Sequence, residues 1–166
     1  MTSAASDLVI APAHEPPFLE DARLLIQEYA ASLSFDLGFQ NLDDEIATLP
    51  GPYAPPRGCL LVARSRDRSV GCVAVRALDR DTAELKRLWL RPDARGMGAG
   101  RKLVTRAVDD AHAMGYVRIR LDTTPEMGAA QALYRSLGFV DIDAYRPNPV
   151  PGTTYLELRL REGGAG

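Results

Sequence analysis

The chain contains the stretch Leu88-Trp89-Leu90-Arg91-Pro92-Asp93-Ala94-Arg95-Gly96-Met97-Gly98-Ala99-Gly100-Arg101. It reads as the end of a strand, a turn that contains proline, and alternating glycines that lead into a helix. A glycine-rich turn between a strand and a helix N-terminus gathers unpaired backbone N–H groups, and the helix dipole favours negative charge there. The stretch therefore predicts a cradle for a diphosphate, with Arg95, Arg101 and Lys102 adding positive charge.

Alternatives to a diphosphate cradle exist for the same residues. The glycines can simply turn the chain at the surface. A lone Gly-x-Gly-x-Gly match is only weak evidence for a phosphate site. Other nucleotide-binding loops fit less well. The Gly-Lys-Ser/Thr ending of a P-loop does not occur here, and the stretch follows a predicted antiparallel meander instead of the first strand of a βαβ unit.

The meander lies directly upstream of this stretch. Three strand-like runs, at residues 59–63, 70–77 and 83–90, are separated by short polar turns, which favours antiparallel pairing. Farther upstream, apolar residues spaced three and four apart predict a helix over 18–33 and a shorter one over 42–49. Residues 8–10 are predicted to form an edge strand of the same sheet.

Downstream of the stretch, helices and strands continue to alternate. The predicted elements are a helix from about Arg101 to Met114 ended by Gly115, a strand over 116–121, a helix over 129–137 ended by Gly138, and strands over 139–143 and 154–160. Together these elements predict one α+β domain around a single sheet, spanning residues 1–166, with flexible ends at 1–7 and 161–166.

The composition is that of an ordinary globular protein and excludes several classes of function. A net charge of −2 among 166 residues gives no field that would hold nucleic acid, so a small-molecule or peptide partner is expected. No apolar run is long enough for a membrane span and no secretory leader is evident, which predicts a cytoplasmic protein without a membrane partner. Cys59 and Cys72 lie in apolar runs and are expected as buried free thiols, and no metal-ligand spacing occurs.

Two segments carry a resemblance to a known family. Residues 84–101 closely resemble motif A of the GNAT acetyltransferases, whose signature is Arg/Gln-x-x-Gly-x-Gly/Ala. Residues 130–139, which include Leu133-Tyr134 and Gly138-Phe139, resemble motif B of that family and follow at the expected distance. The two motifs in this order are far more specific than either one alone.

The resemblance implies a GNAT-like α+β fold, with a mixed and mostly antiparallel central sheet flanked by helices. It also implies that acetyl-CoA binds as co-substrate without a metal. The backbone of Leu88, Trp89 and Leu90 is then expected to pair with the pantetheine arm. The residues expected at the diphosphate are Arg95, Gly96, Met97, Gly98, Ala99, Gly100 and Arg101. Many family members carry Asn where this chain has Met127, so the side-chain bond that this Asn makes to the pantetheine arm is not expected here.

Acetyl transfer to an amine requires a proton acceptor, because at pH 7 the neutral amine of a lysine costs about 4.6 kcal/mol to form. Glu84 is the candidate base, since the histone-acetylating branch of the family carries its glutamate at this strand position. Strand alternation predicts Glu84, Lys86, Leu88 and Leu90 on one face. Glu84 can equally be a solvated carboxylate at the strand end, or pair with Lys86. Glu28 and Asp36 are further candidates.

The departing thiolate requires a proton, and Tyr134 matches the family's general acid. A tyrosine with an ordinary pKa of about 10 remains protonated at pH 7. The alternative is that Tyr134 simply packs in the core beside Leu133, Leu137 and Phe139, as aromatic residues at helical spacing often do.

The sequence thus predicts an N-acetyltransferase that moves an acetyl group from acetyl-CoA to a primary amine of a small molecule or peptide by direct attack. Two other functions fit the same motifs: a non-catalytic acyl-CoA-binding regulatory module, and an acyltransferase that uses a longer acyl-CoA. The residues that would face the acceptor carry no signature that identifies it. A homodimer is possible, because dimers are common in the family that the chain resembles.

Overall fold

The computed structural model describes residues 7–33 and 41–161. The expected flexible ends therefore lie almost wholly outside the described residues, and so does Asp36, one of the alternative bases. Within the described part, no helix has the length and apolar character needed to cross a membrane.

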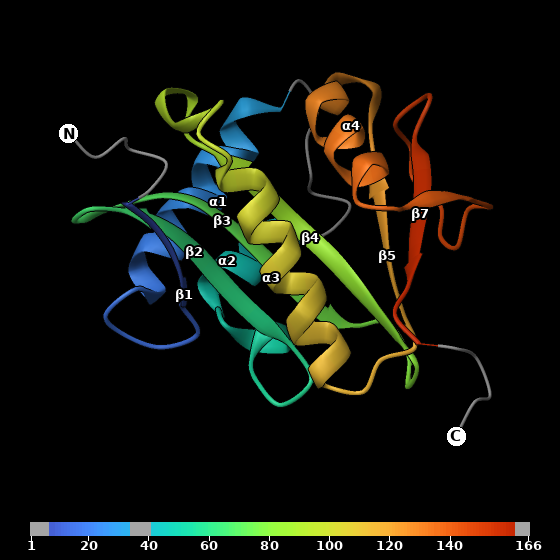
Figure 1. Cartoon of the computed structure of the whole chain (residues 1–166), viewed down its shortest axis with the longest axis horizontal. Coiled ribbons are helices and arrows are strands. Elements are labelled where there is room, and N and C mark those ends of the chain that lie inside the picture. Colours follow the sequence, from blue (N-terminus) through green and yellow to red (C-terminus); the bar gives the residue numbers. More distant parts are fainter. Residues whose placement is uncertain (1–6, 34–40, 162–166) are drawn as a thin grey trace.

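Among the described residues, seven strands form one sheet in the order β1-β2-β3-β4-β5-β7-β6 (Figure 1). Their bounds are β1 Leu8–Pro12, β2 Cys59–Ser65, β3 Arg68–Ala77, β4 Thr82–Leu90, β5 Arg118–Thr123, β6 Val140–Ile142 and β7 Thr154–Arg159. Every neighbouring pair is antiparallel except β4 and β5, which run parallel. The mixed, mostly antiparallel sheet, the meander of β2 to β4 and the edge position of β1 confirm the sequence predictions.

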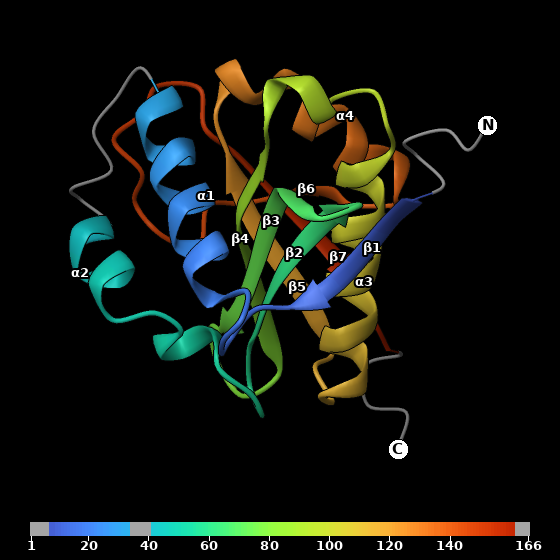
Figure 2. The same ribbon diagram turned by 90° about the vertical axis from the view of Figure 1, so that its left-hand side faces the viewer.

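Helices cover both faces of the sheet (Figure 2). Their bounds are α1 Leu19–Ser32, α2 Leu42–Ala47, α3 Ala99–Ala113 and α4 Gly128–Ser136. Apolar side chains of α1 and α2 pack on one face, and those of α3 and α4 pack on the other. Gly115 and Gly138 follow α3 and α4 with φ of +96° and +100°, so both helices end at the predicted glycines, where an L side chain would be strained.

A β-bulge interrupts β4 at its centre. Cys72 pairs with Trp89 and Ala74 with Lys86, so that Val73 alone lies opposite Arg87 and Leu88. Arg87 takes the left-handed region, with φ of +63°.

The bulge makes the predicted alternation of β4 wrong beyond Lys86. Leu88 and Leu90 pack with Leu85 against the core under α3, whereas Trp89 packs against the core under α1. Arg87 also reaches the α2 side, where it bonds Glu45. Glu84 therefore does not share a face with Leu88 and Leu90, because the extra residue reverses the alternation.

The two parallel strands at the centre of the sheet separate after a short contact. β4 pairs with β5 only through Thr82, Ala83 and Glu84, although β4 continues to Leu90 and β5 to Thr123. The outer edge of β4 beyond Glu84 is therefore open toward β5, while its other edge still pairs with β3 as far as Leu90. This divergence creates the site described next.

Candidate functional site

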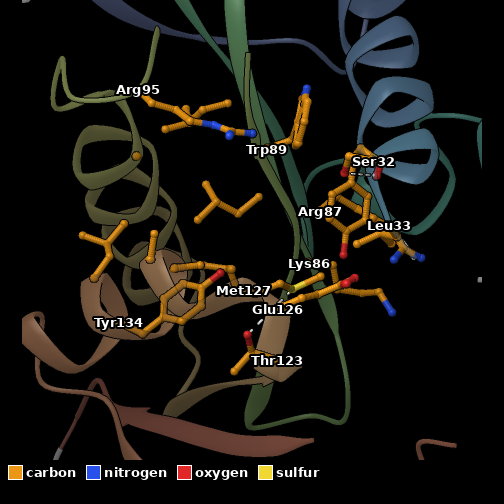
Figure 3. A pocket seen from close by; sticks show the side chains of 18 of the residues that line it. Ser32, Leu33, Lys86, Arg87, Trp89, Arg95, Thr123, Glu126, Met127 and Tyr134 are labelled. Atoms are coloured by element: carbon orange, nitrogen blue, oxygen red, sulfur yellow. Dashed lines mark hydrogen bonds between the residues drawn. The ribbon is translucent and has the colours of Figure 1, made fainter. Parts of the chain in front are cut away.

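A cleft of about 720 Å³ occupies the opening between β4 and β5. Its walls come from the end of α1, residues 85–90 of β4, the glycine loop, the end of β5 and the inner side of α4. Figure 3 shows Trp89, Arg95 and Tyr134 around this space, with Tyr134 reaching in from α4. Of the predicted cofactor residues, Leu88, Trp89, Leu90, Arg95, Gly96 and Gly100 line the cleft.

The glycine loop has the backbone that a diphosphate cradle needs. Gly96 and Gly98 have φ of +85° and +83°, and Gly98 is the residue from which α3 starts. A Cβ at either glycine would meet no atom within 4 Å, so the space in front of both is open. The first N–H groups of α3 have no carbonyl partner inside the helix and add the positive end of its dipole. These features fit a diphosphate.

Gly100 serves a different purpose from the other two glycines. A Cβ at this position would lie 3.3 Å from both Leu133 and Leu90, so the missing side chain allows α3 to approach α4 and β4 closely. The Arg101 side chain bonds Ser136 Oγ of α4 at 2.8 Å. Met97, Gly98, Ala99 and Arg101, which were also predicted to bind the cofactor, are not among the residues that line the cleft.

Trp89 connects the cleft to α1. Its indole Nε1 donates to Glu28 Oε1 at 3.3 Å, and Arg91 donates to both oxygens of Glu28 at 3.0 and 2.9 Å. The bonds from Arg91 lower the pKa of Glu28. On its cleft side, the guanidinium of Arg95 lies 5.2 Å from the Trp89 ring. Glu28 is therefore an anchor between α1 and β4, which weakens its candidacy as a base.

Tyr134 combines the two roles that the sequence left open. Its ring is 5% exposed and packs on Phe139, with ring centroids 5.6 Å apart. Its hydroxyl points into the cleft (Figure 3). Burial raises the pKa of Tyr134, and Tyr29 and Asp122 add to this effect. The phenol is therefore a protonated group held at a fixed place in the cleft wall.

Glu84 is fully buried, which makes the prediction of a solvated carboxylate wrong. It accepts a bond from Arg76 Nε at 3.0 Å and from Tyr145 Oη at 2.8 Å, forms an ion pair with Arg146, and lies 3.9 Å from Lys86 Nζ. The expected contact with Lys86 is thus present. Glu84 does not line the cleft, and taking up a proton would weaken all these contacts.

Asp122 is the carboxylate that β5 brings into the cleft. It accepts a bond from Asn148 Nδ2 at 3.2 Å, and its charge contributes to the raised pKa of Tyr29 and Tyr134. The sequence did not mark Asp122 as a candidate base. Its position near the end of a strand parallel to β4 is the signal that could have marked it.

A partly buried ion pair that the sequence did not reveal lies at the bulge. Arg87 donates to both oxygens of Glu45, from Nε at 2.8 Å and from Nη2 at 3.0 Å, and Tyr53 Oη donates to the same carboxylate at 2.8 Å. Although burial opposes it, this bonding lowers the pKa of Glu45. The α2 helix thereby holds the residue whose left-handed backbone redirects β4 toward the cleft.

Neither cysteine reaches the cleft. Cys59 and Cys72 are both buried and free, as expected from the sequence, and burial raises the pKa of each thiol to about 12. Among the described residues, no three metal-ligating side chains lie together. A thiol nucleophile at this site is therefore not supported by the residues that line it.

Comparisons with known proteins converge on one family. Residues 23–139 match the model of the acetyltransferase (GNAT) family. An uncharacterized N-acetyltransferase from Schizosaccharomyces pombe is 38% identical over 157 residues, covering 93% of this chain and 96% of the relative. The IAA acetyltransferase of Azospirillum brasilense is 37% identical over 110 residues, covering 64% of this chain and 71% of the relative.

Solved structures share the fold. An acetyltransferase from Streptococcus agalactiae superposes with a TM-score of 0.74 at 24% identity, covering 92% of this chain and 98% of that one. An acetyltransferase structure from Salmonella typhimurium, which contains its cofactor acetyl-CoA, gives a TM-score of 0.69 at 22% identity. The match covers 96% of this chain and 97% of that one.

Proposed function

Because the chain belongs to the acetyltransferase (GNAT) family, we propose that it is an N-acetyltransferase that moves the acetyl group of acetyl-CoA directly to a primary amine. The observation that carries this proposal is the opening between β4 and β5. It has the start of α3 at one end and the hydroxyl of Tyr134 in its wall.

The donor would be held mainly by backbone groups. The N–H groups of residues 95–101, at the positive end of α3, would bind its diphosphate. The open edge of β4 at residues 88–90 would pair with the amides of the pantetheine arm, as an added strand does. When bound, acetyl-CoA supplies a thioester, which is an acyl group activated toward an amine.

The proton of the attacking amine goes to Asp122 in this proposal, and Glu84 takes no part. An amine with a pKa near 10.4 costs about 4.6 kcal/mol to deprotonate at pH 7, so a carboxylate within the cleft, directly or through one water, lowers the barrier. Asp122 lines the cleft and accepts the bond from Asn148. Glu84 lies outside the cleft and already has four partners.

Tyr134 holds the proton for the departing thiolate. Burial keeps its phenol neutral well above physiological pH, so the proton is present whenever the site is occupied. The ring contact with Phe139 and the packing of α4 restrict the hydroxyl to one position. A general acid at a fixed position contributes roughly 10²–10⁴-fold to the rate.

The test uses the one tryptophan of the chain, Trp89, which lines the cleft. Its fluorescence is expected to change on titration with acetyl-CoA, and free thiol release reports turnover on a panel of amines. Tyr134→Phe should lower kcat about 10²-fold or more while acetyl-CoA still binds. Tyr116→Phe is the control, because it removes a buried hydroxyl that bonds Arg57 outside the cleft lining.

Three results would count against the proposal. If acetyl-CoA changes neither the Trp89 fluorescence nor the heat signal in calorimetry, the cleft is not a donor site. If acetyl-CoA binds but Tyr134→Phe and Tyr116→Phe turn over equally fast, Tyr134 is not the acid. Binding without thiol release on any amine would favour the non-catalytic acyl-CoA module.

A further inference from the structure

Three cationic side chains converge on the single carboxylate of Glu84. Arg76 donates from Nε at 3.0 Å, Lys86 Nζ lies 3.9 Å away, and Arg146 forms an ion pair on the other carboxylate oxygen. Glu84 is fully buried, so it cannot exchange these partners for water. The buried carboxylate of Glu84 is therefore in contact with three positively charged side chains.

Nearby carboxylates are committed to other arginines. Glu45 is bonded through both oxygens to Arg87, and Glu157 is bonded by Arg120 at 2.7 Å, with Arg118 3.8 Å away. Three positive groups therefore share the one negative charge of Glu84, with Asp122 and Glu45 also acting on Lys86.

Arg146 has donor capacity that the described residues do not use. Its Nε is buried and has no hydrogen-bond partner among them. A buried donor without a partner costs roughly 1–3 kcal/mol, so it calls for an explanation. An incoming carboxylate is the natural acceptor, because guanidinium groups bind carboxylates with two parallel bonds.

The cationic cluster formed by Arg76, Lys86 and Arg146 reaches the cleft through Lys86, which lines it, whereas Arg76 and Arg146 are not among the lining residues. Asn148, two residues after Arg146, donates to Asp122 in the cleft wall. Burial lowers the pKa of Lys86 to about 8, with Arg87 and Arg76 adding to this effect and Asp122 and Glu45 opposing it.

We propose that the acceptor is a primary amine that also carries a carboxylate, such as an amino acid, with the carboxylate bound by Lys86 and Arg146 and the amine beside Asp122. This inference rests on the proposed function and adds the class of acceptor. The cleft then matches a zwitterion, with a negative group for the ammonium and positive groups for the carboxylate. A polyamine or an uncharged amine would leave Arg146 Nε unsatisfied.

The experiment compares matched acceptors by thiol release. Each of the twenty amino acids is assayed against its own α-amide, and aspartate and glutamate are also compared with asparagine and glutamine. At least one acid should exceed its amide in kcat/KM by about tenfold or more, because a site built for a polar group rejects the analogue that lacks it. Amides or polyamines that react as well as every acid would overturn the inference.

Two substitutions locate the effect. Lys86→Met and Arg146→Met should each lower the ratio of kcat/KM for the acid to kcat/KM for its amide about tenfold, toward one. Arg66→Met is the matched control, since it removes one positive charge from an exposed pair with Asp7 on the β2–β3 turn. A preference for the acid that survives both Lys86→Met and Arg146→Met would place carboxylate recognition elsewhere and overturn the assignment.

Binding measured without turnover separates this inference from the proposed function. Calorimetry with N-acetylated amino acids, which carry the carboxylate but no reactive amine, should show binding that Arg146→Met weakens about tenfold or more. Absence of acetyl-CoA binding would refute the proposed function. Normal acetyl-CoA binding, with no N-acetylated amino acid bound and no acid preferred over its amide, would refute only the carboxylate inference.

Discussion

Removing the Glu45 carboxylate that pairs with buried Arg87 should destabilise the protein and also loosen the cleft. Arg87 is 4% exposed and donates to both oxygens of Glu45, at 2.8 and 3.0 Å. Breaking a buried ion pair by removing one charge costs about 3–5 kcal/mol, because the other charge is left uncompensated. We expect Glu45→Gln to lose about 3 kcal/mol of unfolding free energy and roughly 6–12 °C in Tm.

The effect should reach the donor site through the bulge. Arg87 sits at φ of +63°, a conformation that costs about 1–2 kcal/mol for a residue with a Cβ, and the bonds to Glu45 offset that cost. Without them, β4 is expected to relax toward regular pairing and to shift Leu88 and Leu90 relative to the cleft. Acetyl-CoA affinity, followed by Trp89 fluorescence, should fall about tenfold.

The assay is urea unfolding, with Asp44→Asn as the control. Asp44 is exposed, and Asp44→Asn removes the same charge from the same helix as Glu45→Gln. Its effect on the unfolding free energy should therefore remain within about 0.5 kcal/mol. The double variant Glu45→Met with Arg87→Met should be more stable than Glu45→Gln, since no buried charge is left alone. If Glu45→Gln and Asp44→Asn unfold at the same urea concentration, the reasoning is refuted.

The pH dependence of the unfolding free energy independently checks that Glu45 stabilises the protein in its charged form. The pKa of Glu45 in the folded protein lies below its ordinary value of 4.5. Its stabilising contribution is therefore fully present above about pH 4.5 and is lost as the pH falls through the lower folded pKa. The difference in stability between wild type and Glu45→Gln should shrink steadily in that acidic range.

Three further predictions follow from single features of the structure. Gly96→Ala and Gly115→Ala both put a Cβ at positive φ in open space, at opposite ends of α3. Both variants should lose about 1 kcal/mol of unfolding free energy, but only Gly96→Ala should weaken acetyl-CoA binding in calorimetry. Equal acetyl-CoA affinities of the two variants would contradict a diphosphate cradle at Gly96. Binding of an N-acetylated amino acid should weaken as the pH rises through about 8, where Lys86 loses its proton. Lys86→Arg should make this binding less dependent on pH. Binding by the wild type that does not change with pH would contradict a role of Lys86 in holding the carboxylate. Cys59 and Cys72, with pKa values of about 12, should react with a thiol reagent only after urea unfolding, and rapid labelling of the native protein would show that they are accessible.

Local sequence was sufficient for most of the secondary structure. The spacing of apolar residues located all seven strands and the four helices to within a few residues, and Gly115 and Gly138 marked where α3 and α4 end. These features depend on neighbours within a few positions, through side-chain periodicity and the freedom of glycine to take positive φ. The paired motifs around Gly96 and Tyr134 indicated the family in the same way.

The direction in which the β4 side chains point was not available from the sequence. Perfect alternation was the natural expectation, and one extra residue at Arg87 reversed it for every position that follows. The bulge is stabilised by Glu45 on α2, a residue whose distance along the chain gives no hint of the contact. A buried ion pair between distant residues forms only when the helix packs on the sheet.

Which carboxylate faces the cleft was likewise a matter of tertiary structure. Glu84 and Asp122 lie on adjacent parallel strands, and either one is a reasonable base by residue type alone. Folding brings Tyr145 and Arg146 from the far end of the chain onto Glu84 and leaves Asp122 at the point where the strands part. The sequence determined the elements and the two motifs of the family, because those follow from short-range periodicity and backbone freedom. The charge environment of each carboxylate was decided by long-range packing, because burial and partners set whether an acid is free to take a proton.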